Sequence, residues 1–355
     1  MTVPFNIGVL QLSMETVRET VAMAKACEDA GFDTFWIAEA YPWWRKHGFE
    51  ARSSTAILAA IAMETRRIHL GWGIISPYTR HPVQIAMEAR VMQDLAGDRF
   101  LLGLGASKIF MKEIGEGEGE KVGPATVMRE SIEIIKGVLK GEAFEYQGKV
   151  FAASVPPLKS EAHTPRGVPP IYIAGTGPVL QKAAGSIGDG LLTASITTPE
   201  FVRYSRKNME EGAVKAGKDA SKLVLGSVIV GSIGRDSAKG REGAREQAAM
   251  YLANKVQNIR GSADVLLQCA GLTFDELRPV ADAMEKGGRR AAAKTVTDEI
   301  LRKVCAIAGT PEECIERMEQ YRAAGCTHIM LEIWGDDRTG QAKLFGEAVL
   351  PHFRK

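Results

Sequence analysis

The sequence predicts an α/β protein that folds as a (β/α)8 barrel, and three observations lead to this fold class. Short apolar runs suited to buried strands occur eight times along the 355 residues. Segments with helical periodicity separate these runs, which is the alternation of a parallel sheet with crossover helices. Loops rich in glycine or polar residues follow several of the runs. A doubly wound open sheet is the competing interpretation, and the count of eight favours the barrel.

The first half of the barrel is predicted from apolar runs and from helix start and stop signals. Gly31 is a C-cap, because glycine readily takes the left-handed conformation that ends a helix. Ser53 and Ser54 are N-cap residues for the second helix. Pro82 suits the first position of the third helix, where its missing N–H is not needed. The strands span residues 5–10, 34–38, 68–75 and 100–104, and the helices span 15–30, 53–65, 83–95 and 125–139.

The second half follows the same logic. The fifth strand breaks at a Gly-Thr-Gly-Pro turn, residues 175–178, into a helix, and Gly325 caps the helix before the last strand. The strands span residues 169–174, 190–193, 223–230 and 327–333, and the helices span 178–187, 199–216, 311–324 and 339–350.

Three segments lie outside this alternation and are predicted to be insertions in one barrel domain, residues 1–355. They lie at about 105–124, 142–163 and 237–306. The first holds a glycine- and charge-rich loop, and the second is predicted to be an irregular or hairpin excursion with a turn at Gln147-Gly148. The third, which follows strand seven, is helical and shows no convincing strand.

Composition narrows the classes of function. The net charge of +2 gives no support for nucleic-acid binding. No apolar run approaches the roughly 18 residues of a membrane span, and the N-terminus lacks the features of a signal peptide. The five cysteines are scattered and form no C-x-x-C pair, as in reduced thiols of a cytoplasmic protein. No zinc-ligand spacing is present, so no metal site is predicted.

The loop GIISPYTRHP at residues 73–82 carries the most specific signal. It resembles the matching loop of methylenetetrahydromethanopterin reductases, which belong to the bacterial-luciferase-like superfamily and use the deazaflavin coenzyme F420. In that family a non-prolyl cis peptide makes a bulge behind the deazaflavin ring, and the matching bond here is Gly73–Ile74. An ordinary strand end followed by a turn is the alternative. Further similar segments occupy residues 94–105, 171–178, 189–190, 296–299, 308–313 and 349–353.

The resemblance implies a cofactor site made by the ends of three strands. The predicted cofactor-binding residues are Gly73, Ile74, Ile75, Ser76, Gly105, Ala106, Ser107, Ala174, Gly175, Thr176 and Gly177. The glycine turn 175–177 opens a helix, whose first N–H groups attract phosphate, and flavin and deazaflavin coenzymes both carry one. The alternative is a tight turn that needs glycine for its geometry alone.

Glu39 is the predicted catalytic residue. Related deazaflavin enzymes often have an Asp-His pair here, whereas this chain has Glu39-Ala40, and His47 is a distant substitute. A carboxyl group at an apolar strand end tends to keep its proton and can donate it. A structural hydrogen-bond role is the alternative. Lys108 stands where some relatives have a catalytic carboxylate.

The predicted substrate-binding residues come from two loops. Tyr41, Trp43 and Trp44 follow strand two and would form an aromatic wall for a planar substrate, with packing under a loop as the alternative. Tyr78 and Arg80 lie in the signature loop, where a guanidinium can hold an acidic group. His81 is either a catalytic residue or a loop anchor.

The predicted function is F420-dependent hydride transfer. The acceptor would be methylenetetrahydromethanopterin-like or another electron-poor C=N, C=O or aromatic compound. One alternative is an FMN-dependent luciferase-like monooxygenase that uses oxygen and a partner reductase. Another is a non-catalytic flavin-binding barrel. The resemblance also implies a homodimer, and a small molecule is the expected partner rather than nucleic acid or membrane.

Overall fold

Eight parallel strands close into a barrel. The structure, a computed structural model, describes residues 3–39, 52–106, 122–157, 167–193, 195–257 and 263–354. The strands of the barrel are β1 (Asn6–Leu12), β2 (Thr34–Ala38), β3 (His69–Trp72), β4 (Phe100–Gly105), β7 (Ile171–Ala174), β8 (Gly190–Thr193), β9 (Val224–Ile233) and β11 (His328–Ile333). They pair in the order β9-β11-β1-β2-β3-β4-β7-β8, and a β8–β9 pairing closes the ring. The predicted barrel is therefore confirmed and the open sheet is excluded.

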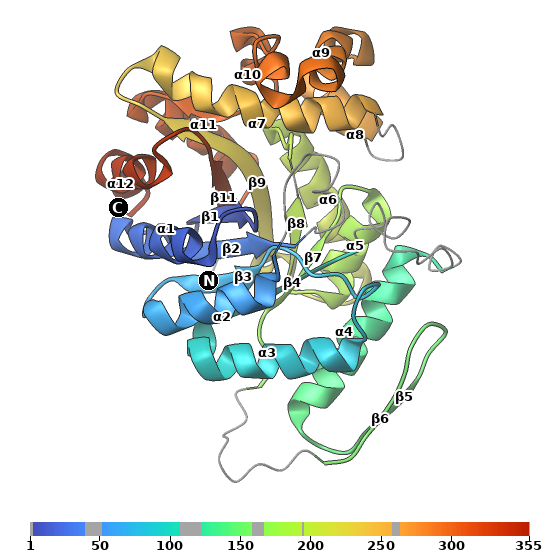
Figure 1. Cartoon of the computed structure of the whole chain (residues 1–355). Helices are drawn as coiled ribbons and strands as arrows, with labels where there is room; N and C mark the ends of the chain where they lie inside the picture. Colours follow the sequence, from blue (N-terminus) through green and yellow to red (C-terminus); the bar gives the residue numbers. More distant parts are fainter. Residues whose placement is uncertain are drawn as a thin grey trace.

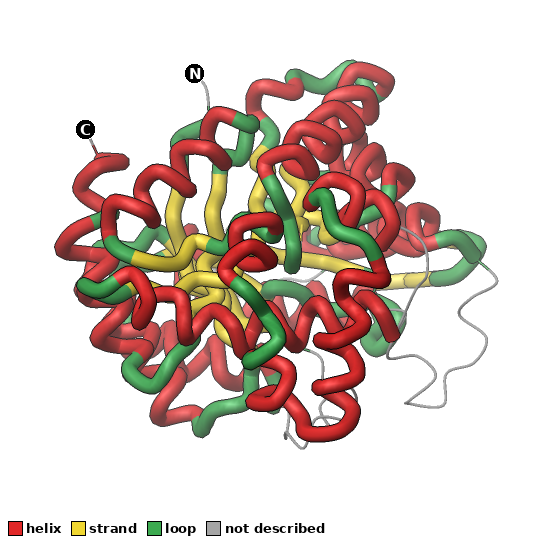
Figure 2. Tube along the Cα trace, turned by 90° about the horizontal axis from the view of Figure 1, so that it is seen from above, coloured by secondary structure: helices red, strands yellow, loops and turns green. Residues whose placement is uncertain are grey.

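Helices surround the barrel, with the strands at the centre (Figure 2). They are α1 (Val17–Ala30), α2 (Ser54–Glu64), α3 (Pro82–Ala96), α4 (Pro124–Lys140), α5 (Pro178–Ile187), α6 (Pro199–Lys215), α11 (Pro311–Ala323) and α12 (Arg338–Ala348). Short 3-10 helices cover Gly97–Arg99, Ala220–Lys222 and Leu350–Arg354. Local signals place these ends as predicted: Gly31 is a left-handed C-cap of α1, and Ser53 caps α2.

Two layers of side chains make the core. Residues that alternate along each strand point either toward the helices or into the barrel. The inner layer includes Leu10, Trp36, Leu101, Tyr172 and Met330. Trp36 is fully buried, and its Nε1 donates to Thr34 Oγ1 at 2.8 Å. The barrel interior is therefore filled by side chains rather than open.

Gly71 leaves the space that the Trp36 ring occupies. A Cβ at Gly71 would lie 2.1 Å from Trp36 Cε3. Gly71→Ala is therefore expected to lower the free energy of unfolding by roughly 1–3 kcal/mol, because an overpacked core must distort. Urea unfolding would measure this change. Gly123→Ala is the control, since its Cβ would meet no described atom within 4 Å; an equal loss in both variants would contradict the explanation.

The structure adds one strand that was not predicted. β10 (Ile307–Gly309) pairs with Gly231–Ile233 of β9, beyond the part of β9 that pairs with β8. Three residues are too few to show a strand period in the sequence. The third strand is also shorter than predicted, since the ladder of β3 ends at Trp72 and Ile75 makes only an isolated bridge to Leu104.

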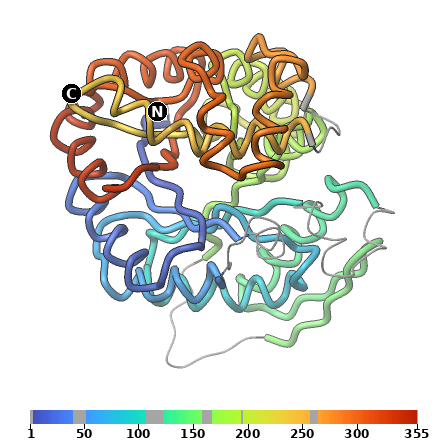
Figure 3. Tube along the Cα trace, turned by 45° about the horizontal axis from the view of Figure 1, so that its top comes forward, coloured from blue at the N-terminus to red at the C-terminus, as the bar shows by residue number. Residues whose placement is uncertain are grey.

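The described parts of the second and third predicted insertions lie on opposite sides of the barrel (Figures 1 and 3). Most of the first, at about 105–124, lies outside the described residues. The predicted hairpin is present as β5 (Phe144–Gln147) and β6 (Ala152–Val155), which pair antiparallel. The C-terminal insertion consists of α7 (Ser237–Gln257), α8 (Ala263–Ala270), α9 (Phe274–Ala293) and α10 (Asp298–Lys303). These helices share a second apolar cluster with β9. Tyr251 of α7 and Met284 of α9 also pack against the inner layer of the barrel.

Candidate active site

Four neighbouring strands bring the described candidate residues to one end of the barrel. Glu39 follows β2, residues 73–76 follow β3, Gly105 ends β4 and Ala174 ends β7. These strands are consecutive in the barrel, and Gly105 is the register partner of Ala174. Carboxyl ends of barrel strands are where active sites form in this architecture. Tyr41, Trp43, Trp44 and Ser107 lie outside the described residues, as do Ala40, His47 and Lys108.

An apolar floor lies between the ends of β3, β4 and β7. The Gly73–Ile74 peptide bond is cis, as predicted. The Ile74 side chain lies over Gly105, because a Cβ there would be 2.8 Å from Ile74 Cδ1 and 3.3 Å from Ala174 Cβ. We call Ile74, Gly105 and Ala174 the floor. Since none of its side chains is polar, the floor suits a flat apolar ring rather than an ion.

Two other predicted cofactor residues support the floor from the signature loop. Ile75 is fully buried, and its N–H donates to Gly103 O at 3.0 Å. The Ser76 hydroxyl donates to Ala106 O at 3.2 Å and accepts from Tyr78 N at 3.3 Å. Ser76 thus ties the loop after β3 to the loop after β4.

The two glycines of the turn after β7 differ in what they do. A Cβ at Gly175 would lie 2.5 Å from Leu180 Cβ, so packing alone accounts for that glycine. A Cβ at Gly177 would meet no described atom within 4 Å, and its φ of −89° suits any residue. Neither packing nor backbone conformation among the described residues therefore explains the missing side chain at Gly177.

Glu39 does not have the apolar surroundings that the sequence predicts. Its Oε1 lies 2.7 Å from Arg80 Nη1, and its Oε2 accepts from Arg80 Nη2 at 2.9 Å and from Ser54 Oγ at 2.8 Å. The Glu39 side chain is 7% exposed and that of Arg80 is 18% exposed. The Glu39 carboxylate is thus paired with the Arg80 guanidinium and the Ser54 hydroxyl. This geometry corresponds to the structural hydrogen-bond role that was the alternative for Glu39.

The same pair changes the interpretation of Arg80. Its guanidinium was expected to orient an acidic group of the substrate. In the structure it bridges Glu39 and Glu88, with Nε 3.6 Å from Glu88 Oε1. The Arg80 side chain thus links the loop after β3 to the end of β2 and to α3.

Two other residues of this loop have separate surroundings. The Tyr78 hydroxyl is buried, and no polar partner for it lies among the described residues. Burial raises the pKa of Tyr78. His81 caps α3, because its Nδ1 accepts from Val83 N at 3.3 Å, and its ring packs on Phe151. The structure therefore shows His81 as a loop anchor.

Glu332 is a buried acid that the sequence argument did not single out. It lies in β11, where alternate residues His328, Met330 and Glu332 occupy inward positions, and it is 2% exposed. Gln247 Nε2 donates to Glu332 Oε1 at 2.6 Å, and the Tyr251 hydroxyl donates to Oε2. Burial raises the pKa of Glu332 to about 7, against the lowering effect of these hydrogen bonds. The sequence signal that could have identified Glu332 is a carboxylate at an inward position of an otherwise apolar strand.

A neighbouring inward residue is held neutral by burial. Burial lowers the pKa of His328 to about 3, and its Nε2 lies 2.8 Å from Thr34 Oγ1. The His328 ring packs against Trp36 with centroids 5.7 Å apart. His328 is therefore part of the packed interior below the floor.

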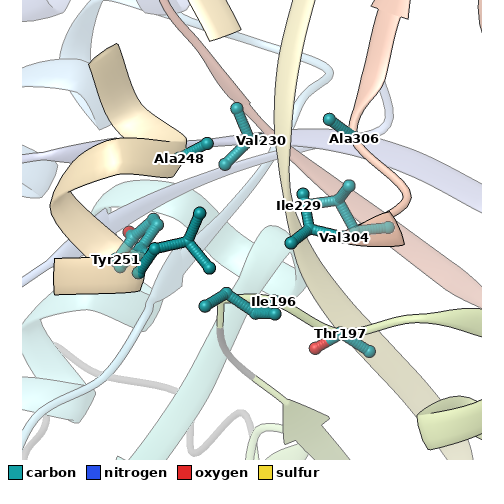
Figure 4. A pocket seen from close by; sticks show the side chains of 9 residues that line it. Ile196, Thr197, Ile229, Val230, Ala248, Tyr251, Val304 and Ala306 are labelled. Carbon is teal, nitrogen blue, oxygen red and sulfur yellow. The ribbon is translucent and has the colours of Figure 1, made fainter. Parts of the chain in front are cut away.

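A small cavity lies beside Tyr251, between the insertion and the barrel (Figure 4). Its volume is about 10 Å³, which is the space of about one water molecule. Its lining residues are Ile196, Thr197, Ile229, Val230, Ala248, Tyr251, Leu252, Val304 and Ala306. A planar coenzyme does not fit in such a volume, so this cavity is a packing gap and not the site.

Two negative findings apply to the described ranges. No three His, Cys, Asp or Glu side chains there are grouped as a metal ion would require. None of the helices there combines the length and the apolar character that crossing a bilayer requires.

A family model for luciferase-like monooxygenases matches residues 1–328. The chain belongs to this family. Among relatives of this luciferase-like chain, the 5,10-methylenetetrahydromethanopterin reductase of Archaeoglobus fulgidus is 31% identical, over 93% of this chain and 94% of the relative. The F420-dependent glucose-6-phosphate dehydrogenase of Nocardia farcinica is 28% identical, over 95% and 94%.

A solved structure agrees with these matches along nearly the whole luciferase-like chain. It is the coenzyme F420-dependent tetrahydromethanopterin reductase of Methanopyrus kandleri, at 28% identity and a TM-score of 0.85. The match covers 99% of both chains. The resemblance inferred from the loop at 73–82 is therefore confirmed at the level of family and fold.

Proposed function

We propose that this luciferase-like protein is an oxidoreductase that uses coenzyme F420 and transfers a hydride between the deazaflavin and an organic acceptor. The relatives at 28–31% identity are F420-dependent enzymes or reductases of a methanopterin derivative. The observation that carries the proposal is the floor of Ile74, Gly105 and Ala174 beside the turn at Gly175–Gly177. It combines an apolar surface for a ring with a helix start for a phosphate.

The residues present fit a deazaflavin. Gly105 gives the Ile74 side chain room to lie flat, since a Cβ there would come within 2.8 Å of it. Gly177 leaves space at the first turn of α5, where the leading N–H groups have no partner within the helix. The floor would hold the ring, and Thr176 and Gly177 would hold the phosphate.

The chemistry of hydride transfer belongs to the coenzyme when it is bound, and the protein supplies position and surroundings. Ile74 would support one face of the ring. Ser76, through its bonds to Ala106 and Tyr78, keeps the loops on either side of the floor together. Tyr78, with Tyr41, Trp43 and Trp44, is the proposed wall against which the acceptor lies.

The acceptor that the site favours is one that takes a hydride without a proton. Glu39 is tied to Arg80 and Ser54 at the end of β2, so we assign it no role as a proton donor. A methylene-pterin iminium already carries a positive charge, so its reduction needs no proton donor. A neutral carbonyl or nitroarene would need one.

The test is an anaerobic acceptor panel with reduced F420, followed by the absorbance of the coenzyme. Turnover with methylenetetrahydromethanopterin and none with neutral carbonyl compounds is the expected result. Turnover with glucose 6-phosphate and oxidised F420 would move the assignment to a sugar dehydrogenase. Oxygen-dependent turnover with reduced FMN alone would contradict F420 use and point to the monooxygenase alternative.

A further inference from the structure

A buried amide holds the turn that the proposed function assigns to phosphate. Gln181 of α5 is fully buried, and its Nε2 donates to Thr176 O at 3.1 Å and to Ser205 Oγ at 2.9 Å. Its Oε1 accepts from Asn208 Nδ2 at 2.9 Å. Both N–H groups of the amide and its oxygen are therefore used. A fully satisfied buried network of this kind fixes the geometry of its members.

This network sets the orientation of one peptide plane. The peptide bond between Thr176 and Gly177 is trans, and in a trans peptide the C=O and the following N–H point in opposite directions. The Thr176 carbonyl points toward Gln181, on the side where α5 packs on α6. The N–H of Gly177 consequently points away from that interface.

No described atom fills the space where a side chain of residue 177 would begin. A Cβ at Gly177 would meet no described atom within 4 Å, whereas one at Gly175 would meet Leu180. The Cα of Gly177 therefore borders open space at the start of α5, and its N–H makes no backbone hydrogen bond among the described residues. Hydrogen bonds from backbone N–H groups to an ionised oxygen are stronger than those between neutral groups.

We infer that Gln181 is a positioning residue for the coenzyme, which acts by holding the Thr176 carbonyl inward so that the Gly177 N–H is presented to the phosphate. This inference rests on the proposed function. The inference concerns the phosphate and not the ring, because none of the hydrogen bonds of Gln181 involves Ile74, Gly105 or Ala174.

The experiment compares equilibrium binding of two ligand pairs, of which the first differs by the whole phosphate-bearing tail and the second by the phosphate alone. One pair is F420 and the ribityl deazaflavin without its phosphate tail, and the other is FMN and riboflavin. Gln181→Met is the main variant, because methionine fills a similar volume without donating to Thr176. Gln181→Asn is the second variant, because its side chain is one methylene shorter and does not place the amide at Thr176. It is used if the first variant does not fold. Ser205→Ala is the matched control, because it alters the same network without touching the turn.

The expected result is about tenfold weaker binding of the phosphate-bearing ligand in the Gln181 variants, the effect of misplacing one charge-assisted hydrogen bond. Binding of the phosphate-free ligand should stay as in the unmodified protein, and Ser205→Ala should bind both ligands normally. An equal loss for both members of a pair, or no loss for either, would overturn the inference. If FMN binds and F420 does not, the proposed function fails while the FMN and riboflavin pair still decides the role of Gln181.

Discussion

Arg80→Met is expected to lower the free energy of unfolding by about 3 kcal/mol, because it leaves the Glu39 carboxylate buried without its cation. The Glu39 side chain is 7% exposed, and among the described residues the Ser54 hydroxyl and N–H are the donors that remain to it. Double-mutant cycles with Glu39→Gln would isolate the pair from the rest of the loop. A coupling free energy of about 1–3 kcal/mol is expected for two groups in direct contact.

The matched control is an exposed ion pair of similar length. Lys25 Nζ lies 3.0 Å from Glu64 Oε2, with side chains 50% and 54% exposed. Lys25→Met is expected to change stability by less than about 1 kcal/mol, because water and salt screen such pairs. Urea unfolding of all four variants would give the values. An Arg80 variant no less stable than the Lys25 variant would show that the Glu39–Arg80 pair does not hold the loop.

The unmodified protein is expected to lose stability as the pH rises from about 4.5 to about 7, and Glu332→Gln is expected to remove this loss. Burial raises the pKa of Glu332 from 4.5 to about 7 in the folded protein. Between these values the unfolded chain releases the proton while the folded chain keeps it, so rising pH favours unfolding. The full effect is roughly 3 kcal/mol, from about 1.4 kcal/mol for each unit of pKa difference.

The difference between the two proteins is the quantity to measure. Other titrating groups, including His328, cancel when the unfolding free energies of Glu332→Gln and the unmodified protein are subtracted at each pH. The charged and titratable groups that interact with Glu332 among the described residues include Tyr251 of α7, Arg289 of α9 and Arg338 of α12. The unfolding free energy of the variant minus that of the unmodified protein should be constant below about pH 4.5 and should increase up to about pH 7. A flat curve throughout would show that Glu332 ionises normally in the folded protein.

The barrel could be predicted because its signals are local. Alternating apolar runs, Gly31 and Ser53 at helix ends and Pro82 at a helix start each report on a few neighbouring residues. The structure confirms the eight barrel strands, the helical insertion and the hairpin. β10 was missed because three residues show no period, and its partner in β9 lies more than seventy positions earlier in the chain.

The candidate site was predicted less completely, because its chemistry depends on distant partners. Glu39 was found as a carboxylate at a strand end, but its partner Arg80 lies 41 positions later, and only the fold brings them together. Glu332 depends in the same way on Gln247, 85 positions earlier. The glycine turn was predicted as one unit, whereas packing separates Gly175 from Gly177. Local patterns therefore identified the loops and left their hydrogen bonds undetermined.

The most direct test of the account is equilibrium binding of F420 and of FMN to the purified protein, followed by absorbance and by quenching of intrinsic tryptophan fluorescence. The proposed function predicts tight binding of F420 and weak binding of FMN. Tight binding of FMN with little binding of F420 would contradict it. The protein would then belong with the oxygen-using members of its family, and the search would turn to a reductase partner.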